Sequence, residues 1–386
     1  MLYDYWKDKQ LIFETFHYII ALIIFIVKLF NEFWNYDKVQ SLYQAMENHW
    51  NIFTNEFEVC ILKDYTSQSR KIIIIYSIMM YVALTIYLMP PFIPILFDLI
   101  WPLNESRPRV FSLSIKWRID MDKYYVPIVC YNSITIMTGI IIMIGVDSIY
   151  ISRTFHACSL FSIVSQQLEK IMSKADTKMK VSRYCGCYIN TNVNRCCANA
   201  MFKLACEHVI YQEYVMCLKK YQIALEFVNI LNSMYRTMTL ISLAISCVIL
   251  SLGGIQLVCV LDQLENVIKN GVLIVGILLQ LLLICYPGQK LLDETENVFY
   301  KIYAVKWYAF PLKLKSLLII SLRKSSIPCG LTAGNLFSLS MVTYGTVSTR
   351  IQNFVLAMYR KQLIYTFLFY LRWCEQEYPT SRHFYH

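Results

Sequence analysis

Five cysteines and one histidine lie close together near the middle of the chain, and their side chains could bind a metal ion. They are Cys185, Cys187, Cys196, Cys197, Cys206 and His208. A zinc site needs four such ligands at closing distance, and Cys-X-Cys followed after eight residues by Cys-Cys is not a common zinc pattern. Because the segment is expected in the cytosol, where thiols stay reduced, we predict ordinary free thiols and no metal.

Motifs for catalysis are missing from the sequence. The chain has no Gly-X-Ser-X-Gly, no His-Glu-X-X-His, no P-loop and no glycine-rich dinucleotide turn. Asp147 and Asp262 directly follow long apolar runs, and we expect each to be a solvated charge at a helix end. Because the runs themselves contain no carboxylate, a proton-coupled transporter is disfavoured. The sequence therefore predicts neither an enzyme nor a bound cofactor.

Aromatic, methionine and hydroxyl side chains recur inside the apolar segments, and these side chains suit the binding of a small ligand. Pockets for mostly apolar molecules are lined by such groups, with a few polar atoms that fix the orientation. The alternative for each position is helix packing or contact with lipid, and for His17 the favoured interpretation is a satisfied interfacial histidine. The candidate ligand-binding residues are Phe13, Phe16, His17, Met80, Tyr81, Tyr87, Tyr131, Thr135, Met137 and Thr138.

The elements that must position these residues are long apolar helices. The sequence is 57% hydrophobic and 16% charged, whereas soluble domains carry about 25% charged residues. Four runs contain no Asp, Glu, Lys, Arg or His: Ile72–Phe97, Tyr124–Val146, Thr237–Leu261 and Asn270–Gln289. A bilayer-spanning helix needs about 20 apolar residues. We therefore predict an all-α, polytopic membrane protein.

Two weaker segments complete the predicted membrane domain. Residues 11–31 are apolar apart from a few polar positions, and residues 331–349 are uncharged but rich in Ser, Thr and Gly, which favour close helix packing. The predicted crossings number six, at 11–31, 72–97, 124–150, 237–261, 270–289 and 331–349. They form a single helical domain over residues 1–386, with 350–386 as its tail. The N-terminal residues do not resemble a signal peptide.

The distribution of charge predicts how the helices are oriented. Residues 153–203 carry eight Lys and Arg against two acids, and residues 290–324 carry seven against three, so both segments are expected in the cytoplasm. The loop 98–123 then lies outside, where its sequon Asn104-Glu105-Ser106 can be glycosylated. By alternation the N-terminus of this chain is also outside. Because topology accounts for the net charge of +10, we do not expect nucleic acid as a partner.

Several motifs, in this order along the chain, resemble the insect odorant receptor family. They are YYVPIVCYNS, then FHACSLFSIVSQQLEKI, and near the end CYPGQKLLDETENVFYKIYAVKWY followed by LTAGNLFSLSMVTYG. The resemblance implies a seven-helix membrane protein with a cytoplasmic N-terminus, located in the plasma membrane of sensory-neuron dendrites. It implies a non-selective cation channel gated by a small volatile apolar odorant, in which an odour-tuned subunit forms a heterotetramer with a shared co-receptor.

The resemblance also implies where the functional parts lie. Odorant binds in the outer half of the membrane domain among helices two, three, four and six. The cytoplasmic parts of the late helices, including 289–308 here, anchor the subunits to one another. The last helix lines the pore, and the matching positions are Ser348, Val355, Ala357 and Met358.

This chain departs from the family pattern in two places. Residues 11–30, followed by ENHWNIF, resemble the family's second helix, so we expect the first helix to be missing. Arg350, Arg360 and Lys361 fall where apolar pore-lining residues are expected, and a cation near the gate at 357–361 would repel permeating cations. We therefore expect a partial, mis-spliced or degenerate receptor that conducts poorly.

Three rival classes remain as alternatives. A gustatory receptor would carry a Thr-Tyr motif ending in Gln-Phe in the last helix, where this chain has TYGTVSTRI. A G-protein-coupled receptor would end its last span with an Asn-Pro-X-X-Tyr motif. A solute transporter would show internal repeats or intramembrane charges.

Overall fold

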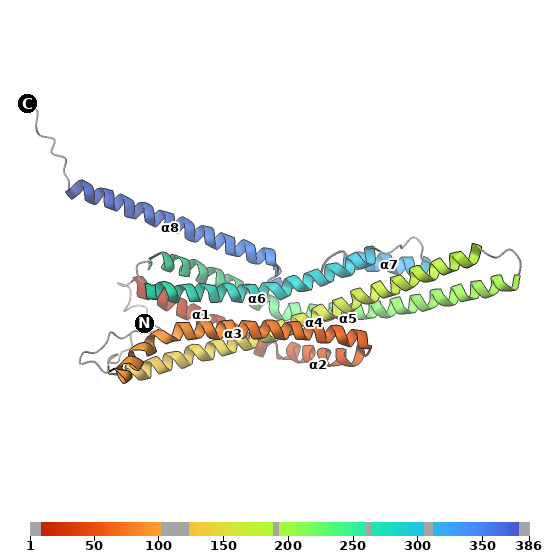
Figure 1. The fold of residues 1–386 in the computed structure, drawn as a ribbon, viewed down its shortest axis with the longest axis horizontal. Coiled ribbons are helices and arrows are strands. Elements are labelled where there is room, and N and C mark those ends of the chain that lie inside the picture. The colour runs from red at the N-terminus through yellow and green to blue at the C-terminus, as the bar shows by residue number, and fades with distance from the viewer. Residues whose placement is uncertain (1–8, 102–122, 188–192, 260–263, 305–311, 378–386) are drawn as a thin grey trace, which may run out of the picture.

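The computed structural model describes residues 9–101, 123–187, 193–259, 264–304 and 312–377. Within these ranges the chain is almost entirely helical, which confirms the predicted all-α fold (Figure 1). The elements in chain order are α1 (Lys9–Trp34), α2 (Tyr36–Ile52), α3 (Glu56–Ile100), α4 (Tyr125–Cys187), α5 (Val193–Cys259), α6 (Leu264–Tyr303), α7 (Leu312–Ser325), β1 (Thr332–Ala333), β2 (Phe337–Ser338) and α8 (Met341–Glu377).

Four of the described helices are long and apolar enough to cross a membrane. The candidate spans are Glu56–Asp98, Tyr125–Lys174, His208–Val258 and Val267–Tyr303, in α3, α4, α5 and α6. Each overlaps one of the four uncharged runs. Only 17% to 50% of the most apolar window in each span is buried by protein, so the rest of that surface is available to lipid.

These helices extend far beyond the predicted crossings. The crossing predicted at 124–150 lies in a helix that continues to Cys187, and the one predicted at 237–261 lies in a helix that begins at Val193. An apolar run marks only the part of a helix that needs lipid. The polar continuations stay helical because one face packs into a shared core, in which Phe161, Tyr214 and Phe227 are fully buried.

Prolines do not end the helices that contain them. α3 passes through Pro90, Pro91 and Pro94, and α6 passes through Pro287. In membrane helices the backbone groups that proline frees can be satisfied by neighbouring segments. The Tyr125 hydroxyl at the start of α4 donates a hydrogen bond of 2.8 Å to the Pro91 carbonyl, which joins α4 to the end of α3.

The predicted crossing at 331–349 is wrong in its first half. Residues 332–338 form a small antiparallel hairpin in which Thr332 pairs with Ser338. Gly334 and Asn335 both have φ of 60°, a conformation that Gly and Asn adopt most readily. α8 begins only at Met341 and runs to Glu377, so residues 350–377, expected as a tail, are helical. A short hairpin therefore takes the place of the predicted helix over residues 332–338.

The hairpin docks onto α5 and α6. The Gly334 amide donates to the Arg236 carbonyl at 2.9 Å, and the Thr332 amide donates to Asn232 Oδ1 at 2.9 Å. A Cβ added to Gly288 would lie 2.3 Å from the Leu339 carbonyl oxygen, so α6 and the segment after the hairpin approach as closely as backbones can. Gln289 Oε1 accepts a 3.1 Å hydrogen bond from the Met341 amide and so caps α8.

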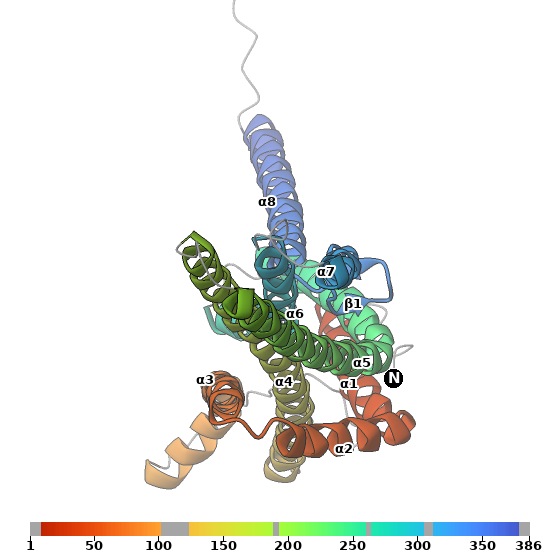
Figure 2. The same cartoon turned by 90° about the vertical axis from the view of Figure 1, so that its right-hand side faces the viewer.

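α8 starts against the other helices and then leaves them. Its first part contacts α5 and α6, and a Cβ added to Gly254 would lie 2.1 Å from Val355 Cγ2. Farther along, α8 diverges from the rest of the molecule in both views (Figures 1 and 2). The end of α3 and the start of α6 lie at one end of the long axis, and α7 and the end of α4 lie toward the other (Figure 1).

Candidate functional site

A small group of apolar side chains lies where α1, α3, α4 and α6 meet, and we call it the apolar cluster. Its members are the buried Tyr76, Met80, Met143 and Ile144, with Phe25, Ile140 and Leu283 packed against them. It is separate from the larger core formed mainly by α4, α5 and α6. The side chains are aromatic, sulfur-containing or aliphatic, which are the types that line sites for small apolar ligands.

One wall of the apolar cluster depends on a glycine. A Cβ added to Gly139 on α4 would lie 2.5 Å from Cε2 of Phe25 on α1. The phenyl ring therefore rests directly on the α4 backbone, and a larger residue at this position would displace it. α1 can approach α4 this closely only because position 139 has no side chain.

An ion pair lies beside the apolar cluster, fully enclosed by protein. Lys28 Nζ on α1 bonds to Asp147 Oδ1 on α4, and the two side chains are 0% and 4% exposed. The Tyr76 hydroxyl on α3 donates to Asp147 Oδ2 at 2.9 Å. Asp147 was expected as a solvated charge at a helix end, which is wrong because α4 continues past it and Lys28 supplies its counter-ion. A charge buried this deeply is tolerated only when it is paired.

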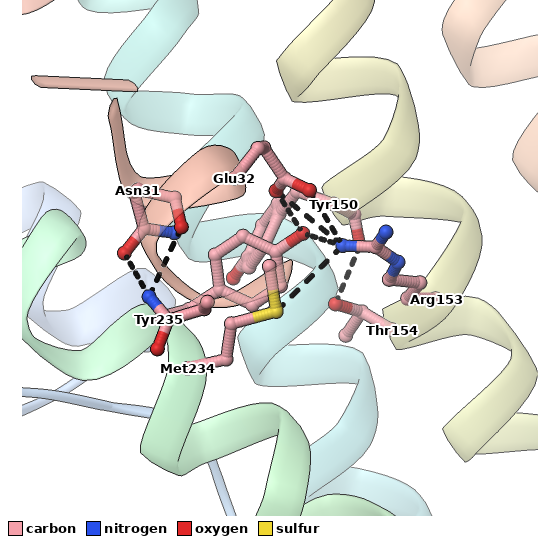
Figure 3. Close-up of polar contacts among 8 residues, drawn as sticks. Asn31, Glu32, Tyr150, Arg153, Thr154, Met234 and Tyr235 are labelled. Carbon is pink, nitrogen blue, oxygen red and sulfur yellow. Dashed lines mark hydrogen bonds and ion pairs between the residues drawn. The ribbon is translucent and has the colours of Figure 1, made fainter. Parts of the chain in front are cut away.

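A second polar group lies one helical turn farther along α1 (Figure 3). Arg153 on α4 donates through Nη1 to Glu32 Oε2 at 3.1 Å and to the Tyr235 hydroxyl at 2.5 Å. The Tyr235 hydroxyl in turn donates to Glu32 Oε1 at 2.8 Å, which brings α5 into the network. Tyr150 packs edge-on against Tyr235 and donates to the Ile284 carbonyl of α6 at 3.0 Å. The network therefore joins α1, α4, α5 and α6.

Two histidines meet where α2 crosses α4. His49 Nδ1 and His156 Nε2 are 3.0 Å apart, and the two ring planes differ by only 5°. Phe227 of α5 packs edge-on against both rings. Burial lowers the pKa of His49 to about 4, so this imidazole is neutral at neutral pH. In the part of the chain that the structure describes, no group of three metal-binding side chains could complete a metal site here.

Of the predicted ligand residues, the structure places Met80 in the apolar cluster, where it is buried. Phe16 and Tyr81 are exposed on the surfaces of α1 and α3. Tyr87 is half-buried, and Lys269 Nζ lies 5.8 Å from its ring centroid. Tyr81 therefore lies on a different face of α3 from Met80, whereas Tyr87, two turns after Met80, shares the face of Met80.

The predicted residues on α4 do not reach the apolar cluster. Tyr131 and Met137 are exposed, Thr138 is exposed, and Thr135 is half-buried. The hydroxyls of Thr135 and Thr138 donate to carbonyls of their own helix at 2.9 Å and 2.8 Å. These positions lie within a candidate membrane span, where outward side chains face lipid.

The predicted pore residues all lie on α8. Ser348, Val355 and Met358 are half-buried, and Ala357 is exposed. Arg350 and Arg360 are exposed on the same helix. Several further predictions fall on side chains or segments outside the described part of the chain: Phe13, His17, Asn104, Cys185, Cys187, Cys196, Cys197, Cys206, Asp262, Trp307, Tyr308 and Lys361.

Comparisons with known proteins agree with this architecture. A family model described as 7tm odorant receptor matches residues 10–349. The chain belongs to this odorant receptor family. Odorant receptor 67a of Drosophila melanogaster is 29% identical over 119 residues, which cover 31% of this chain and 29% of that protein. The chain thus aligns with less than a third of the length of that curated relative.

Two solved structures share the fold of this odorant receptor family member. Both are the insect olfactory receptor OR5 from Machilis hrabei, one of them in complex with eugenol, with TM-scores of 0.62 and 0.65. Each match covers 92% of this chain and 82% of the OR5 chain at 11% sequence identity. The predicted polytopic odorant-receptor-like fold is therefore confirmed.

Sequence reasoning missed the polar residues that this odorant receptor buries, above all Lys28, Asp147, Glu32 and Arg153. Asp147 was expected to be a solvated charge after an apolar run, and Lys28 was not singled out. One signal was available: Lys28 is a single charge directly after an apolar stretch and before Leu29–Phe30. Isolated charges in membrane segments are usually paired and functional.

Proposed function

We propose that this chain is an odour-tuned receptor subunit that binds a small, uncharged, mostly apolar odorant at the apolar cluster. The observation that carries the proposal is the family match over residues 10–349, which includes every helix that encloses the cluster. OR5 of Machilis hrabei, which shares the fold, has been solved with eugenol, a small aromatic compound.

The electrostatics of the cluster favour a neutral ligand. Lys28 and Asp147 are already paired with each other, and the Tyr76 hydroxyl donates to the same carboxylate. An ionised ligand would bring an unpaired charge into a buried site, which is costly. A neutral apolar molecule gains about 25 cal/mol for each Å² of apolar surface that it buries. Neutral odorants should therefore bind better than volatile acids or amines.

We further infer that the receptor works as a cation channel with a co-receptor subunit in the plasma membrane of sensory neurons. Large apolar side chains are exposed on α7 and around the hairpin, outside the four candidate spans. They include Leu312, Ile319, Ile320, Ile327, Leu336 and Phe337. Exposed apolar surface away from lipid is typical of contacts between subunits. In this proposal α8 lines the pore through Ser348, Val355, Ala357 and Met358.

Electrical recording tests the proposal. The chain is expressed in a heterologous cell with and without the co-receptor, and surface amount is measured by labelling. We expect a cation current evoked by neutral odorants such as eugenol, and only when both subunits are present. Absence of any evoked current from cells that carry both subunits at the surface would refute the channel proposal.

Binding is tested separately with the purified protein in detergent. Neutral odorants should raise the melting temperature, whereas volatile acids and amines of similar size should not. Met80→Ala should weaken the stabilisation because the side chain lies inside the cluster, and Met137→Ala, at an exposed position of α4, serves as the matched control. Equal effects of the two variants would place the ligand elsewhere.

A further inference from the structure

We propose that Tyr76 is the positioning residue that couples the apolar cluster to the buried Lys28–Asp147 pair. Through it, a ligand that enters the cluster would change how α1 packs against α4. The inference rests on the proposed function, because it concerns how binding at that site is converted into a response.

Tyr76 belongs to both structures at once. Its ring is a buried member of the apolar cluster, together with Met80 and Met143. Its hydroxyl donates to Asp147 Oδ2 at 2.9 Å, while Oδ1 of the same carboxylate bonds to Lys28. One tyrosine on α3 therefore connects the ligand-facing side chains to an ion pair that joins α1 and α4.

A ligand can move this ring more easily than it can move the ion pair. Met80, one turn farther along α3, has a flexible side chain that can make room for a ligand. A shift of the Tyr76 ring would stretch or break its hydroxyl bond to Asp147. Because bonds to a buried charge are worth more than neutral ones, the carboxylate and its Lys28 partner would have to rearrange in response.

The pattern of charges restricts the rearrangement to distinct positions. α1 carries Lys28 and, four residues later, Glu32, whereas α4 carries Asp147 and, six residues later, Arg153. A slide of α1 by one turn would bring Glu32 toward Asp147 or Lys28 toward Arg153. Both outcomes place like charges together in a buried site, so intermediate or slipped positions are disfavoured. A pairing of this kind gives two helices few allowed arrangements, as a switch requires.

The test is the variant Tyr76→Phe, which keeps the ring in the cluster and removes only the hydroxyl. Currents are recorded with the co-receptor, without odorant and over a concentration series of eugenol, isoamyl acetate and octanol, and are normalised to surface amount. Tyr36→Phe, at an exposed position at the start of α2, is the matched control.

We expect Tyr76→Phe to change the ligand-free current by about tenfold, the effect of losing one hydrogen bond to a charge. We expect Tyr36→Phe to behave like the unmodified chain. The ligand-free current is the decisive measurement, since loss of a simple ligand contact cannot shift an equilibrium in the absence of ligand.

Several results would overturn the inference. Tyr76→Phe could match the unmodified chain in every current, or it could shift only the odorant concentration for half-maximal response, which would make Tyr76 a ligand contact.

If Tyr76→Phe does not reach the surface, Asp147→Asn, which keeps the side-chain shape, takes its place. Unchanged ligand-free current in Asp147→Asn, or failure of both variants to reach the surface, would show that Tyr76 and the Lys28–Asp147 pair serve folding alone. A silent unmodified receptor at the surface would instead refute the proposed channel, and the coupling with it.

Discussion

Glu32 and Arg153 show how strongly single residues are constrained in this fold. Arg153 is 2% exposed, and its Nε and Nη2 atoms have no hydrogen-bond partner within the described residues. Glu32 supplies its counter-charge. Glu32→Gln should therefore lower the free energy of unfolding by about 3 kcal/mol, because it leaves a buried charge uncompensated.

Thermal unfolding in detergent measures this effect. Glu226→Gln, at an exposed position of α5, should change stability by less than about 0.5 kcal/mol. The double variant Glu32→Leu with Arg153→Met should recover most of the loss, since it removes both charges. A double variant no more stable than Glu32→Gln alone would show that the pair contributes something other than charge balance.

The lowered pKa of His49 predicts that the stability of the protein depends on pH. Its pKa is about 4 in the folded chain and 6.5 in the unfolded chain, so the unfolded chain binds the proton more readily. The contribution of His49 to the free energy of unfolding is therefore fully present above pH 6.5. It is lost as the pH drops toward 4, by up to about 3 kcal/mol in total. The melting temperature should fall between about pH 7 and about pH 5, and less so in His49→Gln. An identical fall in the variant would contradict this assignment.

At the level of elements, the contact between α6 and the hairpin segment depends on Gly288. Gly288→Ala would place a methyl group 2.3 Å from the Leu339 carbonyl oxygen, and backbone cannot move aside cheaply. We expect a loss of about 2 kcal/mol. Gly276→Ala on the same helix meets nothing within 4 Å and should be neutral or stabilising by up to about 1 kcal/mol. Melting temperatures of the two variants make the comparison, and equal values would show that the close approach does not form.

α8 carries the second prediction at this level. Arg350 and Arg360 are exposed on the helix that we propose as the pore lining, where positive charge repels cations. Replacing both by Ala should increase the odour-evoked cation current at equal surface amount. Arg323→Ala, at an exposed position of α7, should leave it unchanged. If removal of both charges has no effect on current, these positions do not face the ion path.

For the whole molecule, the orientation of the helices gives a test that does not depend on odorants. Asn104 lies in the segment after α3. In the topology expected from the charge distribution, this segment is on the opposite side of the membrane from the basic segments 153–203 and 290–324. We expect a glycan at Asn104, seen as a mass shift that a glycosidase removes and that Asn104→Gln abolishes. Unglycosylated protein from a secretory system would reverse the proposed sidedness.

The sequence predicted the parts of this fold that depend on local composition. The four uncharged runs identify the helices that can span a membrane, since a long apolar helix is stable in lipid by itself. The charged pairs were not predictable in this way. Lys28 and Asp147 are 119 residues apart in sequence, and a charge after an apolar run looks the same whether it meets water or a partner. The hairpin at 332–338 was missed because its composition resembles that of a small-residue membrane helix.

The length of α4 and α5 has a mechanical consequence. At 1.5 Å per residue, helices of 63 and 67 residues are about 95 Å and about 100 Å long. These lengths are roughly three times the thickness of the hydrocarbon core of a bilayer. Each of these helices thus continues without a break far beyond the part that can lie in lipid. A small tilt of such a long helix at one end therefore produces a large displacement at its other end.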